Sequence, residues 1–270
     1  MPFNPDRINI HELTIEEPEK QTELPFDVER DITESDWEKL GEGLEEVRQS
    51  NNWFSFSSRA MKVKILDPSR DLGLDHKAIQ GMKNDLEKLR QDDRWNSFVR
   101  RTMQMKILDP SQDLSLNEDT WRGMRNELEK ERKFFNWDDF SSIAMHMKIL
   151  DPNQDLTLDQ EAWQGMTARL GVFRQAEIWE EFARLAVSIK ILDPNKNLNL
   201  DQDTWQDMKI KLNESEQDNN WEQFSSLAMN MKILAAEEVK VTNKGLEINM
   251  RKKKDALALE VPPIPEIKKF

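Results

Sequence analysis

A strict internal period of 42 residues constrains this chain more than any other feature of its sequence. Two markers define the period: a tryptophan that opens one helical segment, and a Lys-Ile-Leu triplet that begins eleven residues later. The tryptophans are Trp53, Trp95, Trp137, Trp179 and Trp221, and the triplets begin at Lys64, Lys106, Lys148, Lys190 and Lys232. Five equal copies without insertion or deletion indicate one supersecondary unit that packs against neighbouring copies of itself.

Each copy is predicted to form two helices joined by a short polar break. In the first copy, Thr33 is suited to cap a helix, with Asp36 three residues later, and the break is Gln49–Asn52. The second helix runs from Trp53 to a stop at Asp67-Pro68, because proline disfavours helical geometry before it and lacks a donor N–H. Glycines recur inside the first helix of three copies, at Gly81, Gly123 and Gly165. A mid-helix glycine is unfavourable, so we expect a neighbouring helix to approach closely there.

Neither helix buries its apolar stripe alone, which predicts an all-α solenoid of five 42-residue helix-pair repeats over residues 33–236. Residues 237–250 alternate apolar and polar side chains around an Asn-Lys-Gly turn. This pattern predicts a small C-terminal β-hairpin, which we expect to cap the open end of the stack. Residues 1–32 are predicted to be an acidic, mostly disordered arm, and residues 251–270 a basic, proline-containing tail.

A known repeat family shares part of this pattern. The segment Trp37-x-x-Leu40-Gly41-x-x-Leu44, with Ala60 23 residues after the tryptophan, resembles the signature of tetratricopeptide repeats. The resemblance covers residues 33–234 and implies a right-handed superhelix of helix pairs that holds peptides or partner proteins. The present unit is eight residues longer than that family's period, and only its first copy carries Trp-x-x-Leu-Gly. The longer loop changes the rotation between units, so the resemblance does not define a binding groove.

The charge and composition of the chain exclude several classes of function. The net charge of −13 disfavours a nucleic acid or an anionic membrane as partner. There is no cysteine, so the chain has no disulfide, thiolate metal site or cysteine nucleophile. No window approaches the roughly 20 apolar residues that a membrane span requires, and the first 26 residues lack an apolar signal-peptide segment. These features predict a soluble, cytoplasmic protein.

The loops between repeats are the best candidates for metal binding. Asp151, Asn153, Asp155 and Asp159 place oxygen side chains at alternating positions, as calcium loops do. An EF-hand would need glycine at the sixth position and glutamate at the twelfth, where this loop has Leu156 and Ala162. The simpler interpretation is that these residues end one helix, form a turn and cap the next. A calcium-responsive structural protein remains the alternative hypothesis.

Catalysis has little support in the sequence. His11, His76 and His146 occupy unrelated positions in the repeat, so they form no recurring acid–base or metal site. No phosphate-binding glycine loop and no nucleophile elbow is present. We therefore expect a protein without enzymatic activity and without a cofactor.

Partner selectivity should reside in positions that differ between repeats, because positions shared by all repeats are required for stacking. The second and fourth repeats differ from the others just before and within the second helix, at Arg94, Arg100, Ile178 and Arg184. The first, third and fifth repeats carry asparagine and serine at the corresponding places. The sequence thus predicts a protein–protein interaction scaffold, with these four residues as candidate contacts for a partner protein or peptide.

Overall fold

The computed structural model describes residues 26–27, 31–156, 158–243 and 245–250. Within them the helices are α2 (Glu34–Gln49), α3 (Trp53–Leu66), α4 (His76–Gln91), α5 (Trp95–Leu108), α6 (Glu118–Lys133), α7 (Trp137–Leu150), α8 (Gln160–Gln175), α9 (Trp179–Leu192), α10 (Gln202–Gln217) and α11 (Trp221–Ala235). The strands are β1 (Glu238–Thr242) and β2 (Gly245–Asn249). The predicted fold class of five helix pairs with a C-terminal hairpin is confirmed.

Local signals set the helix boundaries. Thr33 caps α2 in a capping box: its hydroxyl accepts from the Asp36 N–H, and the Asp36 carboxylate accepts from the Thr33 N–H. The N-caps of α4, α6, α8 and α10 each accept a hydrogen bond from the amide three residues on; they are Asp75, Asn117, Asp159 and Asp201. Helices α3, α5, α7 and α9 end at an aspartate in extended geometry before proline.

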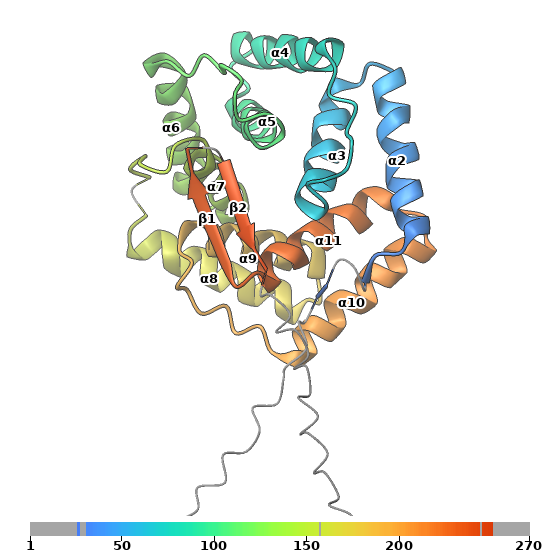
Figure 1. Cartoon of the computed structure of the whole chain (residues 1–270). Helices are drawn as coiled ribbons and strands as arrows, with labels where there is room; N and C mark the ends of the chain where they lie inside the picture. The colour runs from blue at the N-terminus through green and yellow to red at the C-terminus, as the bar shows by residue number, and fades with distance from the viewer. Residues whose placement is uncertain (1–25, 28–30, 157, 244, 251–270) are drawn as a thin grey trace, which may run out of the picture.

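The five helix pairs close into a ring. The second helices α3, α5, α7, α9 and α11 pack side by side in that order, and α11 packs against α3. We call these the inner helices. Helices α2, α4, α6, α8 and α10 lie around the periphery (Figure 1). The last repeat therefore has a neighbour, and the prediction of an open end capped by the hairpin is wrong.

The contact that closes the ring repeats one made inside the array. Lys190 Nζ on α9 donates to the carbonyl oxygens of Leu234 and Ala236 at the end of α11, both at 2.8 Å. Lys232 Nζ on α11 donates in the same way to Leu66 O at the end of α3, at 2.7 Å. Each lysine supplies a donor and a positive charge to a helix C-terminus, where backbone carbonyls lack helical partners. The fifth repeat therefore binds the first through the same kind of lysine contact that joins the fourth repeat to the fifth.

The recurring glycines make room for tryptophans of the preceding repeat. A Cβ atom added at Gly81 would lie 2.3 Å from Trp53 Nε1, and one at Gly123 would lie 2.4 Å from Trp95 Cε2. The predicted close approach is confirmed, and the approaching group is an indole. Trp37 and Trp121 are buried, and the other seven tryptophans are half-buried against the core. The indoles therefore join consecutive repeats, as the repeat pattern requires.

The hairpin lies over one end of the ring. Its strands are antiparallel, and the facing pairs Val239 with Ile248 and Val241 with Leu246 share one apolar side. These residues pack against the core, and the strands contact α5, α7 and α9 (Figure 1). Gly245 lies next to the carbonyl of Lys106, near the C-terminus of α5. The hairpin therefore covers the end of the ring at which the inner helices terminate.

The opposite end carries the five short turns that enter the inner helices. We call it the turn rim; it comprises Ser50–Asn52, Asp92–Arg94, Phe134–Asn136, Ala176–Ile178 and Asp218–Asn220. The third residue of each turn is the N-cap of an inner helix, and the second has a positive φ. The rim and the hairpin are thus on opposite faces of the ring.

The termini are described only in part. Phe26 and Ile32, from the predicted arm 1–32, are buried in the core. Residues 1–25 and 28–30 of that arm and the predicted tail 251–270 lie outside the described residues. No helix in the described ranges combines the length and apolarity that crossing a membrane requires.

Candidate functional site

The centre of the ring contains a layer of buried polar side chains. The position nine residues after the inner-helix tryptophan is polar in every repeat, and its five residues are buried: Lys62, Gln104, His146, Ser188 and Asn230. This position lies on the side of the helix opposite the tryptophan stripe, which packs toward the outer helices. We call these five residues the axial layer. A polar residue recurring inside an apolar helix was visible in the sequence and could have identified it.

Polar side chains link adjacent inner helices at this level. Ser57 Oγ on α3 donates to Gln104 Oε1 on α5 at 2.7 Å. Arg101 Nη1 on α5 donates to Trp53 O at 3.1 Å, and its guanidinium stacks on the Phe54 ring at 4.1 Å. Buried polar groups require such partners, because an unsatisfied group costs about 1–3 kcal/mol. These contacts join α3 to α5.

Two of the four predicted partner contacts meet in this interior. Arg100 on α5 and Arg184 on α9 are half-buried on either side of α7, and the charge of Arg184 lowers the pKa of Arg100 after the larger effect of burial. Both charges also act on buried His146 of α7. The sequence identified the two arginines by their alternation but could not show that they are neighbours.

The other two predicted contacts lie on the turn rim. Arg94 and Ile178 are the N-caps of α5 and α9, and neither makes a side-chain capping bond. Arg94 is exposed, and Ile178 is 45% exposed. The structure therefore divides the four residues between the rim and the ring interior.

Four large apolar side chains are exposed in or near two consecutive turns of the turn rim. Phe134 and Phe135, in the turn before α7, are 72% and 65% exposed, and Val172 and Ile178, near the turn before α9, are 49% and 45% exposed. We call these four residues the rim patch. Of these four residues, only Ile178 was predicted from the sequence. The signal for the adjacent phenylalanines is that they occupy positions that are polar or small in the other repeats.

Phe135 is also in an unfavourable backbone conformation. Its φ is +55°, and one edge of its ring meets Trp137 with centroids 6.1 Å apart. The same left-handed position in the other turns is occupied by Asn51, Asp93, Glu177 and Asn219. Asparagine and aspartate tolerate this region, whereas an aromatic residue there is strained. Exposure and strain at one side chain are typical of a position kept for function.

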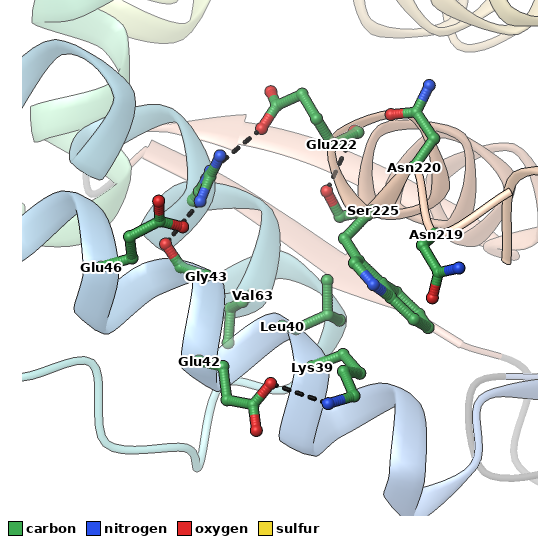
Figure 2. A pocket seen from close by; sticks show the side chains of 12 residues that line it. Lys39, Leu40, Glu42, Gly43, Glu46, Val63, Asn219, Asn220, Glu222 and Ser225 are labelled. Carbon is green, nitrogen blue, oxygen red and sulfur yellow. Dashed lines mark hydrogen bonds and ion pairs between the residues drawn. The ribbon is translucent and has the colours of Figure 1, made fainter.

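A cavity of about 570 Å³ marks the seam between the first and last repeats. Trp221 lines it together with Lys39, which occupies the repeat position of Gly81, Gly123 and Gly165. A lysine leaves no recess for an indole, so the seam is less closely packed than those glycine-lined contacts. Figure 2 shows Lys39 paired with Glu42, both on α2. It also shows Glu222 on the facing helix α11.

Charged contacts cross the seam instead. Glu222 pairs with Arg59 at 3.3 Å and with Lys62, whose side chain is only 6% exposed. Arg59 also donates to the carbonyl of Gly43 on α2. The charged side chains Arg59 and Glu222 that line the seam cavity already pair with each other, so they offer no free charge to a ligand.

The candidate calcium ligands serve their own loop. Asp151 accepts hydrogen bonds from Asn153 N at 2.9 Å and Gln154 Nε2 at 3.4 Å. Asp159 caps α8 through Ala162 N at 3.0 Å and pairs with Arg132. In the described ranges, no three His, Cys, Asp or Glu side chains are grouped to hold a metal ion. The arrangement matches turn and cap geometry.

Comparison with known proteins finds no matching family model, no matching curated protein and no matching solved structure. The resemblance to tetratricopeptide repeats therefore stays a prediction from the sequence.

Proposed function

We propose that this ring is a non-enzymatic scaffold that binds a partner protein on the turn rim, through the rim patch. The repeated helical architecture is compatible with a scaffold, and the observation that carries the proposal is the pair Phe134 and Phe135. These side chains are the most exposed large hydrophobic residues in the described structure. Two adjacent exposed phenylalanines on an otherwise charged protein are typical of interaction surfaces.

The position of the patch supports binding by a folded partner or a helix. Its four residues come from adjacent repeats, and one of them, Ile178, also belongs to the set that alternates between repeats. Rigid helix ends support the turns, so little conformational entropy is lost when a partner docks. Aromatic anchors supply much of the affinity in protein interfaces.

The charges around the patch indicate the chemistry of the partner. Lys133 is exposed beside Phe134, and Arg94 is exposed on the preceding turn. In the described part of the chain, neither residue makes an ion pair or hydrogen bond through its side chain. Asp93 and Glu177 are exposed on the same turns, so a partner segment with apolar side chains flanked by charges of both signs would complement the patch.

The first test is to identify and then remove the contact. A photo-crosslinking amino acid placed at Phe134 should capture a defined protein, which is then purified and titrated with the wild-type ring. Phe135→Asn should weaken that affinity at least tenfold while leaving the ring folded, because loss of an aromatic anchor costs more than about 1.4 kcal/mol. Asparagine also suits the positive φ, so folding should be unharmed.

The matched control is Ile210→Ser. Ile210 is 48% exposed on α10, outside the rim patch, and its substitution should leave the affinity unchanged. Equal affinity for Phe135→Asn and wild type would refute binding through this patch. If the captured protein were a second copy of the chain, the patch would be a homodimer interface instead.

A further inference from the structure

The interior of the ring places two arginines and a histidine together. Arg100, Ser142 and Arg184 occupy the same repeat position on the consecutive inner helices α5, α7 and α9. His146 lies one helical turn further along α7, on the same side as Ser142. Because α5 and α9 flank α7, the two arginines lie on either side of it, and the charge of Arg184 acts on Arg100.

His146 has an unsatisfied polar atom. The residue is only 4% exposed, and its Nδ1 has no hydrogen-bond partner in the described structure. Burial, together with the charges of Arg100 and Arg184, lowers its pKa to about 3, so the imidazole is neutral at physiological pH. A buried polar atom without a partner is rare in folded proteins and indicates a missing ligand or water.

The nearby carboxylates do not use the donors of Arg100. Glu181 pairs with Arg184 within α9. Asp139 accepts a hydrogen bond from Asn136 Nδ2 at 2.8 Å, and it acts on Arg100 only as a nearby charge. Within the described ranges, Arg100 makes no hydrogen bond or ion pair of its own although it is half-buried. A half-buried guanidinium with free donors beside a second arginine is unfavourable without an anion.

We propose that Arg100, Arg184 and His146 form a binding site for a small oxyanion, a phosphate or carboxylate group, in the interior of the ring. The guanidinium of Arg100 presents paired N–H donors that match two oxygens of such a group, and Arg184 supplies the N–H donors that its pair with Glu181 does not use. The neutral imidazole donates from Nδ1 in the tautomer that carries its proton there. The Arg184 side chain is 41% exposed, so the site is open to solvent.

Inorganic phosphate and acetate are the probes. Each is titrated by calorimetry into the full-length protein at constant ionic strength, so that general screening is the same throughout. The anion with the lower dissociation constant shows whether the site prefers a phosphate or a carboxylate group. Arg100→Gln and Arg184→Gln should each weaken that binding at least tenfold, because each removes one guanidinium from the site. Loss of binding in both variants supports the site.

Two controls separate this site from general charge effects and from the rim patch. Arg122→Gln removes the same charge from exposed Arg122 on α6 and should leave anion binding unchanged. Phe135→Asn should also leave it unchanged. Absence of binding by wild type, or equal binding by all four variants, overturns the proposal.

A spectroscopic readout tests His146 directly. The chain has three histidines, so an NMR spectrum contains few imidazole nitrogen signals. The signals that disappear in His146→Gln are those of His146. Addition of the bound anion should shift the His146 Nδ1 signal and leave those of His11 and His76 in place. An unmoved His146 signal under saturating anion would overturn the role of the imidazole.

Discussion

At the scale of single residues, close packing between repeats depends on glycines, whose lack of a side chain leaves room for an indole. Gly123 accepts the Trp95 indole against the backbone of α6, where any Cβ would overlap the ring. Gly171, in α8, has no atom within 4 Å of where its Cβ would be. The same substitution should therefore have opposite effects at these two helical glycines.

Gly123→Ala is expected to lower the free energy of unfolding by about 1–3 kcal/mol, because the indole must move from a packed position. Gly171→Ala is expected to raise it by up to about 1 kcal/mol, because alanine is a better helix former. Urea unfolding followed by tryptophan fluorescence measures both. A stabilised Gly123→Ala variant would contradict the packing of Trp95 on this glycine.

At the scale of helices, the outer elements depend on titratable caps. Asp159 accepts the Ala162 N–H at the start of α8, and this hydrogen bond is the main cause of its lowered pKa, with Arg132 contributing. A carboxyl group whose folded pKa is lowered stabilises the fold above its unfolded pKa of about 3.9. That stabilisation is lost as the pH falls through the folded pKa.

Asp159→Asn separates the cap from its charge. Asparagine caps the equivalent helix at Asn117, so the substitution should preserve α8 while removing one acid-sensitive group. Between pH 6 and pH 3, the variant is expected to lose less unfolding free energy than wild type. Denaturant titrations at several pH values measure the difference, and parallel pH profiles would exclude a cap contribution from this carboxylate.

At the scale of the whole molecule, ring closure depends on charged contacts between the last and first repeats. Glu222 on α11 holds Arg59 and the buried Lys62 on α3, next to the seam cavity. The equivalent residue of α9 is Glu180, whose pKa is raised by burial and by Glu181. Glu222 therefore compensates a buried cation, whereas the charge of Glu180 is disfavoured.

Glu222→Gln is expected to lower the free energy of unfolding by about 1–3 kcal/mol, because Lys62 loses its carboxylate. Glu180→Gln is the matched control and should be neutral or stabilising, since it removes a disfavoured charge. Hydrogen exchange should show faster exchange in α3 and α11 of Glu222→Gln, with α6 and α7 unchanged. Uniform exchange changes in all helices would show that closure does not depend on this contact.

Much of the fold could be predicted because its determinants are local. Thr33, Asp75 and Asp159 cap the helices that the sequence assigned to them, and the Asp-Pro pairs end the inner helices. The candidate site was less predictable. Arg100 and Arg184 were identified by comparing repeats, but Phe134 and Phe135 were missed because a surface phenylalanine has no periodic signature.

The sequence by itself determined the number, length and boundaries of the repeats, because caps, stops and helical stripes act over a few neighbouring residues. Only the tertiary structure decided that five repeats close on themselves, with Lys232 bound to Leu66 across 166 positions of chain. Closure depends on the sum of small rotations between units, which no single unit specifies. The meeting of Arg100, Arg184 and His146 inside the ring follows from that arrangement, since the inner helices that carry them become neighbours only when the repeats pack.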